Sequence, residues 1–242
     1  MKDLLKYTII GLSVIISVIV LSFAITYYGR SKDTISVTGL GEQTFTSDQI
    51  VWTGRINVDA YDKQEGFKKI EQNQKKVAQY LQQQGINPDE VTFSFVEVNR
   101  QFESIYNNGQ YAGSRFSHYR LSQSFTISSF EVNKVEVVSR EISSLIGQGV
   151  DIESWNPEYY YTKLDDLKLS LIEKASKDAR LRAENIVENA GAKLGKASSA
   201  SLGVFQITAA TGDEEYSYGG AFNTSSKEKK ARITVRVTYK LK

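Results

Sequence analysis

Few side chains in this sequence of 242 residues have the type and spacing that acid–base or nucleophilic chemistry needs. Cysteine is absent, so disulfides, thiolate nucleophiles and cysteine-ligated metal sites are excluded together. His118 is the single histidine, which leaves almost no material for a histidine metal cluster or a nucleophile–histidine pair with a spare histidine. In an alternating strand His118 shares a face with Phe116, Arg120 and Ser122, so we expect it to face solvent or an interface.

Three other groups of residues have structural explanations that outweigh chemical ones. Asp165 and Asp166 begin a helical pattern, where carboxylates complement the helix dipole and adjacent positions do not face each other. Gly39-Leu40-Gly41 lacks the third glycine and the following helix of a phosphate loop, so it predicts a turn at a strand end. Asp213-Glu214-Glu215 lacks the alternating oxygen ligands of a calcium loop. The sequence therefore predicts a protein that is not an enzyme, with no cofactor and no bound metal.

Aromatic residues are the more suggestive group, because rings beside glycine in loops are common at interaction surfaces. Trp155 and the run Tyr159-Tyr160-Tyr161 must place rings on both faces of one strand. We expect an oligomer or ligand interface among the aromatic residues, while some of the rings pack on the domain. The candidates are Tyr106, Tyr111, Trp155, Tyr159, Tyr160, Tyr161, Tyr216, Tyr218 and Phe222.

Residues 7–28 contain no charged side chain and are long enough to cross a hydrocarbon core of roughly 30 Å. We predict a transmembrane anchor, with Tyr27 and Tyr28 in the interfacial belt. The alternative is a cleaved signal peptide with a small-residue site at Ser22-Phe23-Ala24, but the apolar run is long for such a peptide and continues past that site. The nearly contiguous apolar residues of the anchor are Ile9, Ile10, Leu12, Val14, Ile15, Ile16, Val18, Ile19, Val20 and Leu21.

Charge does not set the orientation of this span, because Lys2 and Lys6 on one side are matched by Arg30 and Lys32 on the other. A short tail, one span and a large domain form the usual signal-anchor layout. We therefore expect the bulk of the chain outside the cytoplasm, on the periplasmic side of an inner membrane. The net charge of +2 gives no strong field toward nucleic acid.

The chain divides into a tail (1–6), the anchor (7–28), a juncture (29–34) and one α+β domain (35–242) with a mobile loop at about 209–230. Alternating β-branched and aromatic residues predict strands, and apolar stripes predict three helices that end at Gly85, Gly147 and Gly191. The expected strands cover 35–39, 50–61, 91–102, 114–127, 150–161, 202–207 and 231–241.

Several local signals refine these elements. The apolar phase changes at 95–96, which predicts a β-bulge, and Asn107-Asn108-Gly109 predicts a hairpin turn. Ser128 and Glu131 predict a capping box for the second helix, and Pro157 limits pairing in the fifth strand. The β-α-β-β-α-β order up to that strand is the split βαβ arrangement. We expect one antiparallel or mixed sheet covered by helices on one face.

Several motifs follow one another along residues 35–242 in a specific order and spacing. They are the opening strand Ile35-Ser36-Val37-Thr38-Gly39-Leu40-Gly41-Glu42, the Gly85-Ile86 turn, the stretch Asn156-Pro157-Glu158-Tyr159-Tyr160-Tyr161 followed by Leu164-Asp165-Asp166, the alanine-spaced helix from Ala175 to Glu184, its exit from Ala190 to Lys196, and the strand from Ile233 to Leu241. Together these motifs resemble the SIMPL domain family. The resemblance implies a bacterial cell-envelope protein with a helix-backed α+β fold. It also implies ring- or channel-like self-association in some members, and a link of bacterial members to oxidative-stress defence. It supplies no catalytic residues.

Three hypotheses about function follow, and the first is favoured. The first is a membrane-tethered protein without catalysis that forms homo-oligomers in the cell envelope. The second is an envelope module that binds a small molecule or peptide, which a deep apolar pocket with convergent polar groups would support. The third is an enzyme, which the scarcity of suitably placed titratable groups disfavours.

Overall fold

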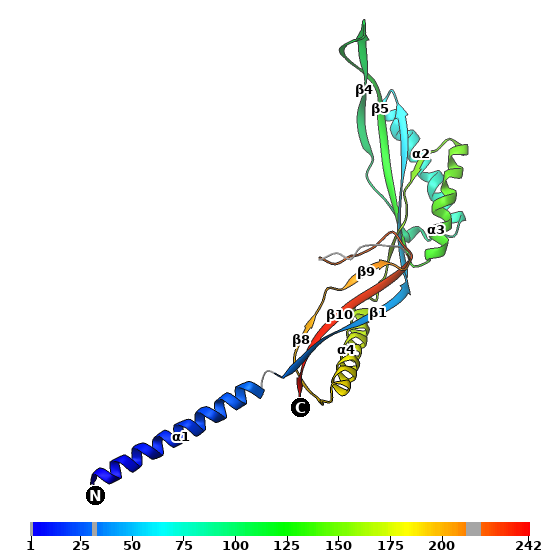
Figure 1. Cartoon of the computed structure of the whole chain (residues 1–242). Helices are drawn as coiled ribbons and strands as arrows, with labels where there is room; N and C mark the ends of the chain where they lie inside the picture. Colours follow the sequence, from blue (N-terminus) through cyan, green and yellow to red (C-terminus); the bar gives the residue numbers. More distant parts are fainter. Residues whose placement is uncertain (1, 31–32, 212–218) are drawn as a thin grey trace.

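The computed structural model describes residues 2–30, 33–211 and 219–242, and it divides the domain between two sheets. Each sheet has its own helices and its own apolar core, and the two halves lie end to end in an elongated molecule (Figure 1). The expectation of a single sheet is wrong. Strand β1 (Thr34–Thr46) pairs with the last strand of the chain, while β2 (Gln49–Ala60) belongs to the other sheet.

The half farther from the N-terminal helix, here called the hairpin lobe, is centred on β2 and β5 (Gln110–Ser129). The strand order is β3-β5-β2-β6, with β4 paired to β5 and β7 paired to β2, and all of these pairs are antiparallel. The remaining elements of this lobe are α2 (Lys63–Gln83), the 3-10 turn η1 (Pro88–Glu90), β3 (Val91–Phe93), β4 (Glu97–Asn107), α3 (Val132–Glu141), the 3-10 helix η2 (Ile142–Gln148), β6 (Asp151–Ser154) and β7 (Glu158–Tyr160).

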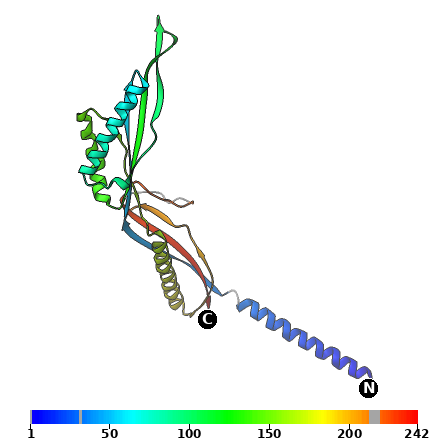
Figure 2. The same ribbon diagram turned by 180° about the vertical axis from the view of Figure 1, so that it is seen from behind.

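Helices α2 and α3 cover the same face of this sheet (Figure 2). The expected alternation in β2 is confirmed, because Trp52, Ile56 and Val58 are buried beneath the helices. Trp52 meets Phe125 of β5 edge to face, with ring centroids 5.5 Å apart. The side chains that the apolar stripes of both helices placed inward, such as Val77 and Val135, fill the same core.

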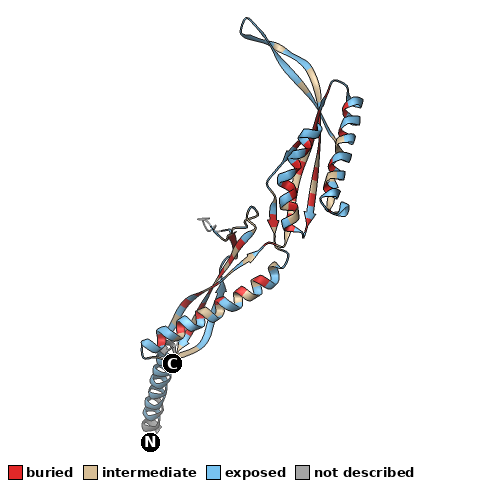
Figure 3. Cartoon of the chain, turned by 90° about the vertical axis from the view of Figure 1, so that its right-hand side faces the viewer, coloured by how far each residue is buried: buried red, intermediate tan, exposed pale blue. Residues whose placement is uncertain are grey.

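The other half, here called the anchor lobe, is a four-stranded antiparallel sheet with one long helix on one face. Its elements are β1, α4 (Leu164–Asn189), β8 (Leu194–Leu202), β9 (Gln206–Ala209) and β10 (Glu228–Leu241), with β10 paired to the other three strands. The predicted alternation of the last strand is confirmed, since Ile233, Val235, Val237 and Tyr239 are buried against α4. Figure 3 shows the buried side of α4 turned toward the sheet.

Close packing between β1 and α4 explains two of the glycines in the sequence. A Cβ at Gly39 would lie 2.1 Å from the carbonyl oxygen of Ala175, and one at Gly41 would lie 2.2 Å from that of Leu171. The expected turn at Gly39-Leu40-Gly41 is therefore wrong: these residues lie within β1, which continues to Thr46. Glycine on the strand and alanine on the helix allow the two backbones to approach.

The N-terminal helix α1 (Lys2–Arg30) contains the expected apolar run. Its stretch from Lys6 to Thr26 is long and apolar enough to cross a membrane, and none of it is buried against the domain. Length and composition are also those of an N-terminal signal sequence, so both interpretations, a retained anchor and a cleaved signal peptide, remain.

Several local predictions hold, and others need correction. The phase change at 95–96, predicted as a bulge within one strand, is a break between two strands, β3 and β4, and Pro157 separates β6 from β7 as expected. The predicted capping box is wrong, because Glu131 is itself the cap residue of α3. The N–H of Glu131 donates a hydrogen bond to the hydroxyl oxygen of Ser129 (3.1 Å). The second helical segment ends at Gly149, in the left-handed conformation, instead of Gly147.

Candidate interaction surfaces

The most prominent surface feature is a hairpin arm formed by β4 and the first part of β5, which extends beyond the helices of the hairpin lobe (Figure 1). Its tip is the predicted turn, and both Asn108 (φ 50°) and Gly109 (φ 80°) have the positive φ of a two-residue type I′ turn. The turn thereby sets the pairing of the two strands next to the tip, where Asn107 lies opposite Gln110.

One face of the arm is largely aromatic. Residues directly opposite each other in an antiparallel pair point to the same side, and the register pairs Phe102 with Phe116 and Tyr106 with Tyr111. The same side carries Val98 and Tyr119. We call this surface the aromatic face of the arm; it consists of Val98, Phe102, Tyr106, Tyr111, Phe116 and Tyr119, interspersed with Arg100, Ser104 and Ser114.

The rings of the aromatic face contact one another, and all except Tyr119 remain open to solvent; Tyr119 is half-buried and packs against the core of the hairpin lobe. Phe102 and Phe116 meet edge to face with centroids 6.3 Å apart, and Tyr106 and Tyr111 do so at 6.2 Å. Phe102 is 59% exposed, and Tyr106 and Tyr111 are 66% and 65% exposed. Such a row of large exposed rings is a typical sign of an interaction surface.

A β-bulge at Ser117 determines which residues belong to this face. The register shifts between the Gln101–His118 and Phe102–Phe116 pairs, which leaves Ser117 unpaired. Phe116 is thus turned to the aromatic face, where it lies 4.9 Å from the ring of Tyr119. The expectation that Phe116 shares a face with His118 is wrong for this reason.

The opposite face of the arm is polar. Arg115 pairs with Glu103 across the strands (3.0 Å). At the base of the arm, both oxygens of Asp59 accept 2.8 Å hydrogen bonds from Arg120, and these bonds hold the pKa of the Asp59 carboxyl below its usual value. His118 Nε2 is 3.5 Å from Asp59, and its Nδ1 is 3.0 Å from the hydroxyl of Ser117. His118 therefore belongs to a surface ion-pair cluster, in a partly exposed position.

The other aromatic candidates are distributed between the two cores and the segment that joins the lobes. Tyr159 is buried in the hairpin lobe, and Tyr161 packs on Phe45 of the anchor lobe with ring centroids 4.7 Å apart. Tyr160 is half-buried and donates a hydrogen bond to Glu158 (2.8 Å). Tyr159 is 8% exposed, so only a small part of its surface is open to a partner.

Two candidates remain at the surface and two cannot be placed. Trp155 is 43% exposed with Arg55 stacked over its ring at 5.1 Å, and Phe222 is 54% exposed. Tyr216 and Tyr218, and the acidic segment 213–215, lie outside the described residues. The candidates that the structure describes thus form no single surface, and of these Tyr106 and Tyr111 belong to the arm.

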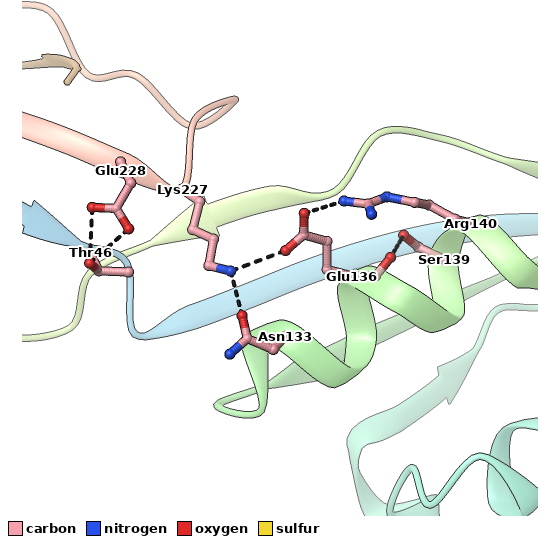
Figure 4. Close-up of polar contacts among 7 residues, drawn as sticks. All are labelled: Thr46, Asn133, Glu136, Ser139, Arg140, Lys227 and Glu228. Carbon is pink, nitrogen blue, oxygen red and sulfur yellow. Dashed lines mark hydrogen bonds and ion pairs between the residues drawn. The ribbon is translucent and has the colours of Figure 1, made fainter. Parts of the chain in front are cut away.

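The lobes meet at a polar junction (Figure 4). Lys227, just before β10, bonds Asn133 of α3, and its Nζ is 3.2 Å from Glu136 on the next turn. The second oxygen of Glu136 pairs with Arg140. On the other side of Lys227, the Thr46 hydroxyl donates to the carboxylate of Glu228 at 2.9 Å. The contacts of Lys227 connect the segment before β10 to a helix of the hairpin lobe, whereas the Thr46–Glu228 bond lies within the anchor lobe.

A cavity of about 450 Å³ lies beside this junction. Burial raises the pKa of Tyr159 on its wall, and the nearby Glu136 raises that pKa further. The cavity is lined by Glu136, Ser139, Arg140, Ser154, Trp155, Asn156, Pro157, Tyr159 and Ser225. The lining is mainly polar, unlike the deep apolar pocket that a typical small-molecule site provides.

Sequence reasoning missed the aromatic face as a unit and missed the junction lysines. Val98, Phe102 and Tyr106 stand four residues apart, so extending the strand alternation past residue 102 could have placed them together. Lys229 occupies a core-facing position of β10, in phase with Ala231 and Ile233, and is 2% exposed. A lysine in phase with the apolar residues of a strand was the signal for its buried role.

The acidic candidates have the expected positions. Asp165 and Asp166 lie in the first turn of α4, and Asp165 is paired with Lys168 at 3.5 Å. Within the described residues, no group of three or more His, Asp and Glu side chains is arranged to hold a metal ion.

The fold and surface define an elongated α+β protein with two lobes, an exposed hairpin arm and an apolar N-terminal helix. Over residues 35–240 the chain matches the SIMPL family, described as a protein of unknown function (DUF541). Because the match spans most of the chain, the protein belongs to this family, as the motif resemblance indicated. A comparison with curated proteins found no match.

Proposed function

We propose that this protein is a non-enzymatic, membrane-anchored component of a cell envelope that self-associates through the aromatic face of its hairpin arm. The observation that carries the proposal is the row of exposed, mutually contacting rings on one side of the arm. The assembly is ring- or channel-like, and oxidative-stress defence is the physiological setting that the family resemblance suggests. We also interpret the hairpin lobe without its arm as a split βαβ core, because β2, α2, β3, β5, α3 and β6 follow one another in that order.

The anchor is the first part of the proposal. The stretch from Lys6 to Thr26 has 21 residues, enough to span a bilayer core of roughly 30 Å at 1.5 Å per residue. We place the rest of the chain on the periplasmic side of the inner membrane. A retained anchor concentrates copies in one plane with a common orientation, which favours weak lateral contacts through a high effective concentration.

The aromatic face suits a second copy of the same chain as its partner. In a two-fold symmetric contact the same patch meets itself, so rings of one arm pack on rings of the other. Arms that project from lobes tethered by the same helix lie at the same height above the membrane. Burial of rings such as Phe102 and Tyr106 would then provide the central contacts that carry most of the energy of an interface.

The test is the size of the full chain in mild detergent, measured by native mass spectrometry or electron microscopy. We expect oligomers of the wild type, and a shift to monomers in a Phe102→Ser, Phe116→Ser variant, with association weakened by about tenfold or more. The matched control is Glu103→Ser with Arg115→Ser, the neighbouring opposed pair on the other face of the arm. A wild type that is monomeric throughout overturns the proposal, as does equal disruption by both variants.

The junction cavity favours a second function, binding of a small polar ligand or peptide. Clefts between lobes are frequent binding sites, and Arg140 and Trp155 at this cavity offer a cation and a ring surface. Trp155 is partly exposed whereas the other tryptophan, Trp52, is fully buried, so a ligand in the cavity should change the emission of Trp155 alone. A Trp155→Phe variant that retains the full ligand-induced fluorescence change would contradict binding at this cavity.

We expect no catalytic turnover. The one histidine, His118, is engaged with Ser117 and a carboxylate that Arg120 already binds through two hydrogen bonds. A turnover found for the wild type and abolished by His118→Ala would overturn this part of the proposal.

A further inference from the structure

A cluster of four exposed lysines lies at the end of the anchor lobe where β1 begins, just after α1. The lysine cluster consists of Lys193, Lys196, Lys240 and Lys242. Its members come from two strands that the backbone holds together: Lys193 and Lys242 exchange both of their backbone hydrogen bonds, at 3.2 Å and 2.8 Å. Lys240 is the register partner of Thr34, the first residue of β1.

The chain geometry keeps this cluster close to the end of α1. The N–H of Leu241 donates to the carbonyl of Asp33 (2.9 Å), so the last strand of the sheet ends beside the start of the first. From Arg30, the last residue of α1, to Thr34 there are four residue steps, which span at most about 14 Å when fully extended. Figure 1 shows the C-terminal end of β10 next to the beginning of β1. If α1 is in a bilayer, the lysine cluster lies at or just above its headgroups.

The lysines of the cluster have no acidic partner among the described residues, in contrast to several cations along α4. Along α4, Lys177 pairs with Glu173 (2.6 Å), and Arg180 pairs with Glu184 (2.8 Å). No carboxylate of the described residues lies within ion-pair distance of the four clustered lysines. Asp33 and Glu188 are exposed acids close in sequence to β1 and to the end of α4, and the four lysines outnumber them.

The local excess of positive charge is a property of this end and not of the whole chain, whose net charge is +2. The cluster also borders a surface cavity of about 610 Å³, with Lys196 and Lys242 in its lining next to Tyr239 and Leu194. Its α4 side contributes Lys177, Arg180 and one acid, Glu173, which is already paired with Lys177 at 2.6 Å. A cavity with cationic and apolar walls suits a group that carries a phosphate attached to an apolar chain.

We propose that the lysine cluster binds the phosphate groups of anionic phospholipids in the leaflet beside α1, so that the anchor lobe rests on the membrane surface. Each lysine close to an anionic surface strengthens binding by about fivefold, and the attraction declines within a Debye length of about 8 Å at physiological salt. The link of four residue steps from Arg30 to Thr34, which is at most about 14 Å long, is short enough to let the cluster come within that range of the headgroups. The inference rests on the proposed membrane anchor. It adds a preference for anionic lipid and a fixed orientation of the anchor lobe relative to the membrane.

The test uses the full chain reconstituted in vesicles of phosphatidylcholine, with or without about 30 mol% phosphatidylglycerol. The chain has no cysteine, so Asn189→Cys, at the exposed end of α4, provides a single site for a fluorophore. Quenching by headgroup-labelled lipid reports how close this site lies to the membrane. Gln110→Cys, near the tip of the arm, is the matched label at the far end of the molecule.

We expect quenching at position 189 to rise about twofold or more when phosphatidylglycerol is present and to fall again in about 0.5 M salt, with no change at position 110. Replacing the four lysines by glutamate should abolish the rise, and replacing them by glutamine should reduce it; the glutamine variant keeps the test decisive if the glutamate variant does not fold. As a control, Lys68→Glu with Lys75→Glu on exposed positions of α2 should leave the rise unchanged.

Equal quenching in both lipid mixtures, or a rise that survives loss of the lysines, overturns the proposal. Resistance of the full chain to extraction by alkaline carbonate is measured in parallel and reports the anchor alone. If the chain is extracted, the anchor proposal itself has failed. If the chain resists extraction but quenching at position 189 is the same with and without phosphatidylglycerol, only the inference about the lysine cluster has failed.

Discussion

The backbone of Gly39 in β1 lies directly against Ala175 in α4, so close that a Cβ at Gly39 would be 2.1 Å from the Ala175 carbonyl oxygen. The same Cβ would be 2.4 Å from the backbone nitrogen of Ala179, one turn further along the helix. Both neighbours are backbone atoms and cannot rotate away. The glycines of β1 and the alanines of α4, which carried the family resemblance, therefore set the spacing between the sheet and the helix of the anchor lobe.

A Gly39→Ala substitution should consequently destabilise the anchor lobe, because the helix must shift to admit the added methyl group. We expect a loss of about 1–3 kcal/mol in the free energy of unfolding, measured by urea denaturation with circular dichroism. The matched control is Gly147→Ala, where the added Cβ would meet nothing within 4 Å. Similar losses in the two variants would contradict the close-packing explanation.

The carboxylate of Asp178 provides a second link between β1 and α4 and should make the anchor lobe sensitive to acid. Its Oδ2 accepts a 2.7 Å hydrogen bond from the N–H of Leu40 and lies 2.9 Å from Arg182, and these contacts lower the pKa of Asp178. A lowered folded-state pKa means that the stabilisation is present above the unfolded-state pKa of about 3.9. It is lost as the pH falls through the lower folded-state value.

We therefore expect Asp178→Ala to reduce the free energy of unfolding by about 1–2 kcal/mol at neutral pH, since the N–H of Leu40 loses its charged acceptor. The difference from the wild type should shrink as the pH falls below about 4. Urea denaturation at several pH values measures it. Glu188→Gln, at an exposed position near the end of the same helix, is the control and should show no comparable pH-dependent difference. A difference between Asp178→Ala and the wild type that persists undiminished in acid would refute this account.

Much of this arrangement could be predicted from the sequence, and the parts that could not depend on contacts distant along the chain. The alternation of β10 and the alanine spacing of α4 identified both elements, because burial on one face imposes those periods. The choice of partner strand could not be predicted. β1 pairs with β10 over thirteen register positions, from Thr34 opposite Lys240 to Thr46 opposite Glu228, and no local pattern encodes that pairing.

Two further features lacked a signal that hydrophobic periodicity can detect. Strand β8 runs through Lys196-Ala197-Ser198-Ser199-Ala200, which has no large apolar residue, and its side chains are exposed. Its strand geometry comes from pairing with β10. The bulge at Ser117 reverses the phase of the strand at one residue, so simple alternation assigned Phe116 to the wrong face of the arm.

Lys229 of β10 should be essential for holding the segments that contain Tyr159 and Asn223 against the anchor lobe. Its buried Nζ donates to the carbonyl oxygen of Tyr159 (2.8 Å) and also bonds the carbonyl of Asn223. Lys229→Met keeps the length of the side chain but leaves buried carbonyls without this donor, so we expect a loss of about 1–3 kcal/mol in the free energy of unfolding. Lys230→Met, one position along the strand and on its other face, is the control. Thermal denaturation that shifts equally in both variants would speak against the buried role of Lys229.

The junction between the lobes should show measurable coupling between Lys227 and Glu136. Their side chains are 29% and 22% exposed and come within 3.2 Å, so the pair is less screened than an open surface salt bridge. A double-mutant cycle with Lys227→Ala and Glu136→Ala should give a coupling energy of about 0.5–1 kcal/mol in urea denaturation.

The control cycle combines Lys227→Ala with Glu131→Ala, since Glu131 pairs with Lys134 instead. We expect its coupling energy to be near zero, because residues without a shared contact have additive effects. The single Lys227→Ala substitution should also weaken the connection between α3 and the anchor lobe, because Asn133 loses its partner as well. Faster amide hydrogen exchange of the 223–228 segment in that variant would reveal this loosening. Unchanged exchange together with zero coupling would mean that Lys227 does not hold the two lobes in place.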